Sequence, residues 1–182
     1  MKQDLLNKQI GVILTDTIYG IVGLALDENV IERIYKIKER NLKKPMIVLI
    51  SSIDDLIDIF KINLDAEHIN ILKEFWPGKT SVILPCREYP FLHRGLNSLA
   101  FRIPQKKELI DLIKEVGPLV ATSANKEGGL SAKNIIEAKQ YFNNEVDFYI
   151  DEGECLSDAS ILVNLKNPNE IEILRGKICL KK

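Results

Sequence analysis

Residues 10–20 read Ile10-Gly11-Val12-Ile13-Leu14-Thr15-Asp16-Thr17-Ile18-Tyr19-Gly20. The apolar run from Ile10 to Leu14 is rich in isoleucine and valine, which predicts a buried strand. Polar residues follow this strand directly, so the threonine hydroxyls and Asp16 emerge at its carboxyl end. Open α/β sheets bind ligands at that edge. The alternative interpretation is a polar turn whose Thr and Asp side chains bond their own backbone.

Apolar runs of the same kind recur along the chain and predict further strands at Met46–Ile50, Ser81–Leu84, Leu99–Ile103, Leu119–Thr122, Phe148–Ile150, Ser160–Val163 and Ile171–Leu174. Helical periodicity lies between them, at Asn29–Arg40, Ile53–Phe60, Ala66–Phe75, Lys106–Val116 and Ala132–Phe142. This alternation favours an α/β sheet with helices packed on it. The strands between residues 81 and 103 follow one another closely enough to be antiparallel. We therefore expect a twisted, mixed sheet flanked by helices.

Length and composition predict one globular domain over residues 1–182. The chain is long enough for one well-filled core and too short for two ordinary domains, and no Pro/Gly/Ser-rich linker divides it. Apolar residues make up 46% and charged residues 28%, which is globular composition. The net charge of −1 argues against broad, nonspecific nucleic-acid binding, which needs a basic surplus. Any anion site must therefore be local.

The cysteines and histidines predict neither a disulfide framework nor a metal cage. Cys86, Cys155 and Cys179 form no CxxC pair, which favours a reducing, cytoplasmic location, and Cys86 and Cys179 are expected to be inert packing residues. His68 and His93 lack a neighbour at ligand spacing, so no metal site made of protein ligands is predicted. No apolar run reaches the roughly 18 residues of a membrane span, and residues 1–8 do not resemble a signal peptide.

Four cations, Lys38, Arg40, Lys43 and Lys44, fall within seven residues where a predicted helix ends. Lys and Arg in a last helical turn complement the helix dipole and can bond free carbonyl groups, so a solvated helix end explains the cluster. A binding site for an anion is the other explanation. The spacing alone leaves both open.

Arg102 is the single cation of an otherwise apolar predicted strand, and Ser98, four residues earlier, lies on the same face. A buried Arg needs an anionic partner, which is either one of the 26 acidic residues or a bound carboxylate or phosphate. Ser123 and Asn125 end another predicted strand before a Gly-rich turn and offer donors to an anion. An ordinary turn and helix cap is the alternative there.

Taken in order, the motifs of residues 10–176 resemble the YrdC/TsaC family, the threonylcarbamoyl-AMP synthases. The family patterns and the residues that match them are P-T-[ED]-x-[YF]-G (14–20, with one spacer more), K-x-R and K-P (38–40 and 44–45), W-P-G-P-x-T (76–81), A-V-R (100–102), S-A-N (123–125), a serine before a β-branched run (160–163) and a closing L-R-G (174–176). Leu14 replaces the family's Pro, Lys79 and Thr80 its Pro and apolar residue, and Ser81 its Thr. The resemblance implies a single YrdC-like domain with a basic concave pocket.

The resemblance also implies a nucleotidyltransferase. Its reaction joins L-threonine, bicarbonate or CO₂, and ATP to give threonylcarbamoyl-AMP and pyrophosphate. The product is the intermediate for threonylcarbamoyladenosine in tRNA, and a tRNA threonylcarbamoyltransferase complex would receive it. Two alternatives stay open. One is a non-catalytic RNA-binding module, with weak RNA binding, and the other is a paralogue that forms a related adenylate with another acceptor.

The resemblance implies a role for each matched residue. ATP would be bound by Lys38, Arg40, Lys44, Ser98, Asn125, Ser131 and Arg175, with Lys38 and Arg40 in the catalytic role. Threonine would be held by Thr17, Arg102, Ser123 and Ser160. Mg²⁺ would be held mainly by phosphate oxygens of ATP rather than by the protein. Lys43 would be left to solvent.

Overall fold

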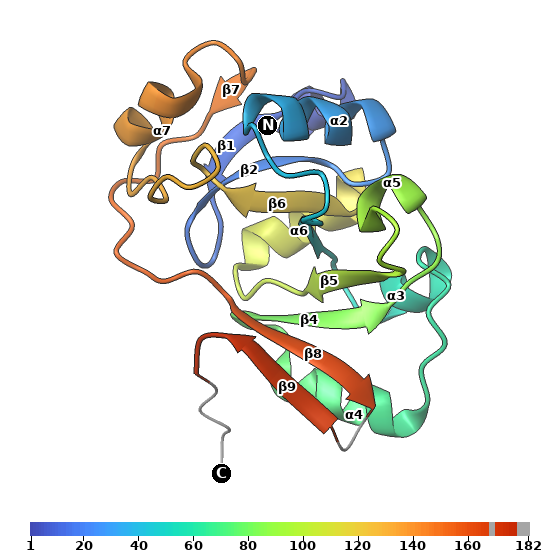
Figure 1. The fold of residues 1–182 in the computed structure, drawn as a ribbon. Helices are drawn as coiled ribbons and strands as arrows, with labels where there is room; N and C mark the ends of the chain where they lie inside the picture. Colours follow the sequence, from blue (N-terminus) through green and yellow to red (C-terminus); the bar gives the residue numbers. More distant parts are fainter. Residues whose placement is uncertain (168–169, 178–182) are drawn as a thin grey trace.

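In the computed structural model, which describes residues 1–167 and 170–177, the strands join in one nine-stranded sheet (Figure 1). Its order is β7-β1-β2-β6-β3-β5-β4-β8-β9. The strands are β1 (Gly11–Leu14), β2 (Tyr19–Leu24), β3 (Ile47–Leu49), β4 (Thr80–Pro85), β5 (Ser98–Arg102), β6 (Leu119–Ser123), β7 (Phe148–Tyr149), β8 (Ile161–Asn167) and β9 (Glu170–Arg175). The pairs β1–β7, β3–β5 and β4–β8 are parallel and the others antiparallel. The predicted twisted, mixed sheet is confirmed.

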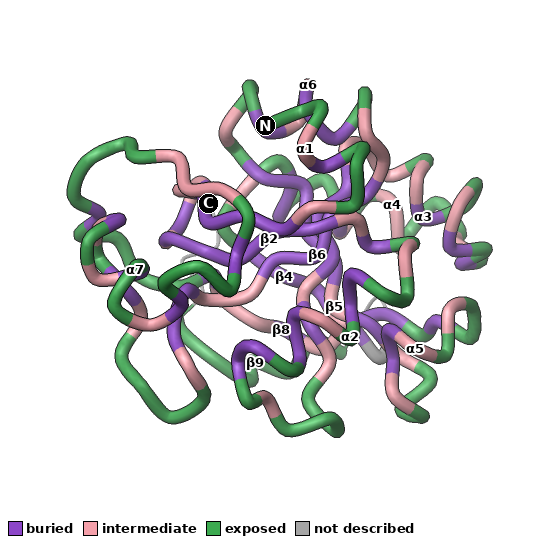
Figure 2. Tube along the Cα trace, turned by 90° about the horizontal axis from the view of Figure 1, so that it is seen from above, coloured by how far each residue is buried: buried purple, intermediate pink, exposed green. Residues whose placement is uncertain are grey.

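Helices cover both faces of this sheet. They are α1 (Lys2–Leu6), α2 (Glu28–Ile37), α3 (Asp54–Asp58), α4 (Ala66–Phe75), α5 (Pro90–His93), α6 (Lys107–Val116) and α7 (Ile135–Phe142). Ile13 and Val22 pack with α1 and α6, whereas their chain neighbours Val12 and Ile21 pack with α2. Adjacent residues of a strand point to opposite faces, so each face has its own apolar cluster. The buried strands run between exposed loops and helix surfaces (Figure 2).

The strand β2 was not predicted from the sequence. Thr15 to Ile18 form a tight turn, and the chain returns as β2 antiparallel to β1, with Leu14 opposite Tyr19. The backbone N–H groups of Thr17 and Ile18 donate to Oγ1 of Thr15 at 3.2 and 3.3 Å. The polar-turn interpretation is therefore right for Thr15. Gly20 and Gly23 interrupt the apolar pattern, so the sequence did not indicate a strand here. In the structure, Gly23 lies where α2 approaches closely and a side chain would not fit.

The first long helix is shorter than predicted at its carboxyl end. Its N-terminus is capped by Asp27, whose Oδ1 accepts a hydrogen bond from the N–H of Val30 at 3.2 Å. The helix ends at Ile37 instead of Arg40, because Glu39 adopts a left-handed conformation with φ of 53°. The cation cluster therefore lies in a loop beyond the helix. The short helices α1 and α5 were also not predicted, and α7 begins at Ile135 instead of Ala132.

The other sequence predictions concern thiols, metals and membranes. Cys86 and Cys155 are buried free thiols, as predicted for Cys86, while Cys179 lies outside the described residues. Within residues 1–167 and 170–177, no group of three or more His, Cys, Asp or Glu side chains could hold a metal ion. None of the helices in the same ranges has the length and apolar character needed to cross a membrane.

Candidate functional site

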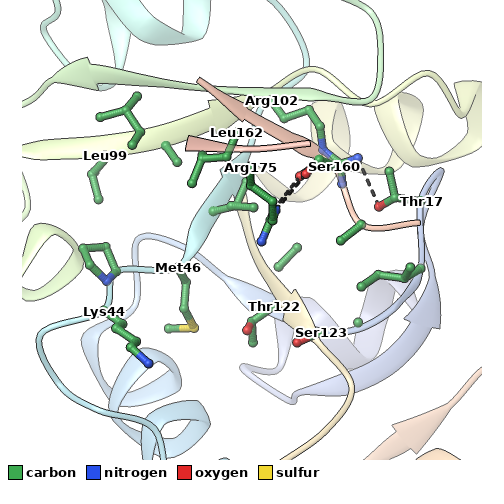
Figure 3. Close-up of a pocket in the computed structure, with 18 of the residues that line it drawn as sticks. Thr17, Lys44, Met46, Leu99, Arg102, Thr122, Ser123, Ser160, Leu162 and Arg175 are labelled. Carbon is green, nitrogen blue, oxygen red and sulfur yellow. Dashed lines mark hydrogen bonds between the residues drawn. The ribbon is translucent and has the colours of Figure 1, made fainter. Parts of the chain in front are cut away.

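A cavity of about 470 Å³ opens beside the central strands, lined by the β1–β2 turn, the loop after α2, and parts of β5, β6 and β8 (Figure 3). Four of its lining residues form one row across neighbouring strands, since Ala121 pairs with Ile47, Ile47 with Ala100, and Ala100 with Ile83. Two alanines in this row leave room above the sheet. The register of these four strands thus places the cavity over the middle of the sheet.

Every charged side chain among the described lining residues is a cation. These residues are Arg40, Lys43, Lys44, Arg102 and Arg175. The polar lining residues are otherwise hydroxyls, at Thr15, Thr17, Ser98, Thr122, Ser123, Ser131 and Ser160. Guanidinium, ammonium and hydroxyl groups all donate hydrogen bonds, so this cavity suits an anionic ligand with many oxygen atoms.

Arg102 lies at one end of the cavity and is held by the β1–β2 turn. Its side chain is 3% exposed, and Nη1 donates to Oγ1 of Thr17 at 3.2 Å. Nη1 also lies 2.8 Å from Oδ1 of Asp16, whose side chain is 4% exposed. Burial lowers the pKa of Arg102, and the carboxylate of Asp16 opposes that shift. The anionic partner that sequence reasoning required is therefore present in the chain, 86 positions earlier.

Arg175 and Ser160 bring the end of the chain to the same part of the cavity. Nε of Arg175 donates to the carbonyl oxygen of Ser160 at 3.0 Å, and Nη2 donates to its Oγ at 3.1 Å. The hydroxyl of Ser160 also lies 2.9 Å from that of the buried Ser81. Figure 3 shows Ser160, Arg175, Arg102 and Thr17 together, with Lys44 at the opposite end.

The loop that follows α2 forms that opposite end, and Arg40 holds it in place. Nε and Nη2 of Arg40 donate to the carbonyl oxygens of Lys44 and Pro45 at 2.9 and 3.0 Å. The ammonium of Lys44 forms an ion pair with Glu127 at 2.5 Å. Lys43 is exposed, as predicted, but it also lines the cavity mouth. The loop thus presents three cations to one space.

Lys38 does not line this cavity. Its side chain is buried, with the residue 1% exposed, and Nζ donates to the carbonyl oxygens of Ser123 and Asn125. The pKa of Lys38 is lowered to about 7, mainly by burial and to a smaller extent by the nearby cation of Arg40. The lysine therefore ties the end of α2 to the end of β6 from behind the lining.

The buried ammonium of Lys38 should make stability depend on pH. Because its pKa is lower in the folded chain, the unfolded chain binds more protons above about pH 7, and stability rises with pH there. Between about pH 7 and pH 9, we expect the free energy of unfolding to rise by about 1–2 kcal/mol more in the wild type than in Lys38→Met. Urea unfolding at several pH values measures the difference. Parallel curves for the two proteins would show that the two carbonyl groups keep the ammonium charged.

Comparison with known proteins identifies the family and the fold. The family model for Sua5, YciO and YrdC proteins, described as telomere recombination, matches residues 3–176. The chain belongs to the Sua5/YciO/YrdC family. A threonylcarbamoyl-AMP synthase of Pyrococcus abyssi is 32% identical, over 77% of this chain and 42% of that protein. A Methanocaldococcus jannaschii protein, provisionally named threonylcarbamoyl-AMP synthase, is 29% identical over the full chain and 86% of its own length.

A solved structure of a family member, P. abyssi Sua5 complexed with L-threonine, superposes with a TM-score of 0.86 at 28% identity. The match covers 96% of this chain and 52% of that one, so the chain spans about half the length of the P. abyssi proteins. The structure of Escherichia coli YciO, at 19% identity and a TM-score of 0.82, shares the fold.

Nine of the eleven site residues that the sequence predicted line this cavity of the Sua5/YciO/YrdC family member. They are Thr17, Arg40, Lys44, Ser98, Arg102, Ser123, Ser131, Ser160 and Arg175. The other two, Lys38 and Asn125, lie behind the lining. The side-chain amide of Asn125 donates to the carbonyl oxygens of Lys126 and Gly129 at 2.7 and 2.9 Å. In this chain, therefore, Lys38 and Asn125 shape the loop after β6, and the remaining nine face the cavity.

Sequence reasoning missed part of the lining. The apolar wall includes Met46, Leu96, Leu99 and Leu162. An apolar residue in or beside a predicted strand has the same pattern whether it faces a core or a cavity, so no sequence signal separated these residues from the core. Asp16 was noted as a polar residue after β1 but received no role. Its only signal was Arg102, whose expected burial called for an anion that was either an acidic residue of the chain or a bound ligand.

Proposed function

We propose that this chain is an L-threonylcarbamoyladenylate synthase. It joins L-threonine, bicarbonate or CO₂, and ATP to give threonylcarbamoyl-AMP and pyrophosphate, which supplies the intermediate for threonylcarbamoyladenosine in tRNA. The observation that carries the proposal is a cavity whose described charged lining is entirely cationic, with a buried Arg at one end. The names of the curated relatives support it, as does the structure of P. abyssi Sua5 complexed with L-threonine.

The proposed chemistry needs charge stabilisation more than a general base. The amine of threonine adds to CO₂ and loses a proton, which gives a carbamate. A carbamate oxygen then attacks the α-phosphorus of ATP, the bond from this phosphorus to the bridging oxygen breaks, and pyrophosphate leaves. All these groups are anionic, so cations that hold them together lower the barrier by proximity and electrostatics.

The two ends of the cavity fit the two substrates of the proposal. Arg102, with Thr17, Ser123 and Ser160 around it, would bind threonine through its carboxylate. The loop of Arg40 and Lys44 would bind the triphosphate, with Ser98, Ser131 and Arg175 also facing ATP, and Lys38 and Asn125 would support that end from behind. Because Arg175 donates a hydrogen bond to Ser160, a residue proposed for ATP adjoins one proposed for threonine, and we propose that carbamate and α-phosphate meet near this pair.

Mg²⁺ belongs to the proposal as a companion of ATP. The described lining residues offer hydroxyl oxygens and no carboxylate, so they fit an ion that arrives on the nucleotide. Mg²⁺ commonly binds through substrate phosphates and waters. Bound in this way, it would neutralise part of the triphosphate charge. The free thiols of Cys86 and Cys155 agree with the proposed cytoplasmic location, where a tRNA threonylcarbamoyltransferase complex would take up the product.

Mass spectrometry of the products tests the proposal directly. Incubation with ATP, Mg²⁺, bicarbonate and threonine is expected to give threonylcarbamoyl-AMP, and pyrophosphate release is expected to depend on threonine. Serine replaces threonine in the matched control and should give much less adenylate. An adenylate formed equally well from another amino acid would contradict the threonine assignment. Salt-sensitive RNA binding without any adenylate would replace the proposal by a binding module.

A further inference from the structure

Asp16 is a buried carboxylate next to the cavity that none of the site assignments uses. It lies in the β1–β2 turn between Thr15 and Thr17, which both line the cavity, whereas Asp16 does not. Its side chain is 4% exposed. Removing a carboxylate from water is costly, so its charge must be compensated by groups around it.

Two contacts fix this carboxylate. The backbone N–H of Gln105, in the loop before α6, donates to Oδ2 at 2.9 Å. Oδ1 lies 2.8 Å from Nη1 of Arg102, the same nitrogen that donates to Thr17. Asp16 therefore connects the β1–β2 turn, the end of β5 and the start of the α6 region. Nη1 of Arg102 thus lies between two neighbouring residues of the turn. It is hydrogen-bonded to Thr17 and ion-paired with Asp16, whose Oδ1 has no hydrogen-bond partner among the described residues.

The electrostatics of this end of the cavity also depend on Asp16. Burial lowers the pKa of Arg102, Asp16 opposes that shift, and the cation of Arg175 lowers the pKa by a smaller amount. Nε of Arg102 is buried and has no hydrogen-bond partner among the described residues. A buried guanidinium with a second cation nearby is held in one orientation more firmly when a fixed anion pairs with it.

From this geometry we propose that Asp16 is a positioning residue, which holds the guanidinium of Arg102 in the orientation that binds the carboxylate of the amino-acid substrate. The identity of that substrate rests on the proposed function. Asp16 does not touch the substrate in this scheme. It acts through Nη1 of Arg102 and leaves the rest of the guanidinium for the ligand.

The test is the substitution Asp16→Asn, which keeps the size of the side chain and an oxygen for the N–H of Gln105 but removes the charge. Calorimetry measures the binding of threonine and of ATP separately. We expect the threonine dissociation constant to rise about tenfold or more, since a bidentate pair depends on fixed geometry. The ATP dissociation constant should change by less than about twofold, a split that a general structural defect would not produce. Asp16→Glu, which restores the charge, should recover part of the threonine affinity.

Asp147→Asn is the matched control. Asp147 also pairs with an arginine, with Oδ2 2.6 Å from Nη1 of Arg33, and it also accepts a backbone N–H, from Ile10 at 2.8 Å. It is outside the cavity lining, so its substitution should leave both dissociation constants unchanged. Unchanged or tighter threonine binding in a folded Asp16→Asn protein would overturn the inference. A wild-type chain that binds no threonine would instead overturn the proposed function, before the variants are compared.

Discussion

Replacing Arg40 with alanine is expected to lower the rate of pyrophosphate release by about a hundredfold or more, the usual effect of removing a group that stabilises developing charge. Arg40 lines the end of the cavity that is proposed for the triphosphate, and two of its nitrogens donate to the carbonyl groups of Lys44 and Pro45. The substitution therefore removes one cation and loosens the loop that carries Lys43 and Lys44. A coupled pyrophosphate assay at saturating threonine measures the rate.

Two further variants separate the loss of the cation from the loosening of the loop. Arg40→Lys keeps the charge but cannot span both carbonyl groups, so its rate should lie between those of the wild type and the alanine variant. Arg87→Ala removes an exposed arginine outside this cavity and should leave the rate unchanged. Near-normal turnover of a folded Arg40→Ala protein would remove Arg40 from the proposed site.

Replacing Arg102 with alanine is expected to raise the KM for threonine about 30-fold or more and the KM for ATP less than about threefold. Truncating one partner of a buried, hydrogen-bonded charge pair costs about 2–5 kcal/mol, and each 1.4 kcal/mol is tenfold in affinity. The effect falls on threonine because Arg102 lies at the end of the cavity away from Lys44 (Figure 3). Steady-state kinetics with each substrate varied in turn separate the two constants.

The alanine variant also leaves Asp16 buried without its guanidinium, which is expected to destabilise the fold by about 3–5 kcal/mol. Arg102→Lys keeps a cation beside Asp16 and should fold, but a lysine cannot form a bidentate pair with a carboxylate. Arg94→Lys is the control, because Arg94 pairs with Glu32 at 2.7 Å away from the cavity. Equal increases in both KM values for Arg102→Lys would contradict the assignment to threonine.

Much of the fold could be predicted because its elements are encoded locally. The apolar runs that became β4, β5, β6 and β8 and the periodic segment of α4 needed only their own residues to be recognised. β2 could not be predicted, because its two glycines lie where neighbouring groups pack closely and look like loop residues in the sequence. Its presence turns the polar stretch after β1 into a hairpin turn, and that turn faces the cavity.

The cation cluster at residues 38–44 shows that a sequence motif does not predict which of its side chains face the cavity. Lys38 and Arg40 are two residues apart in one motif, and the sequence treated them alike. The left-handed backbone at Glu39 separates them, so that Lys38 is buried at the end of β6 and Arg40 lines the cavity. Apolar periodicity carried the predicted helix to Arg40, whereas the left-handed conformation of Glu39 ends it at Ile37.

The amino-acid sequence by itself determined the class of fold and the family, because periodicity and each single motif can be recognised within a short segment. It also required an anion for Arg102. Only the tertiary structure decided which anion, since Asp16 and Arg102 are 86 positions apart and meet through the packing of the β1–β2 turn against β5. Side-chain pairing across such a distance depends on the order of the strands in the folded sheet, which the residues of one segment do not specify.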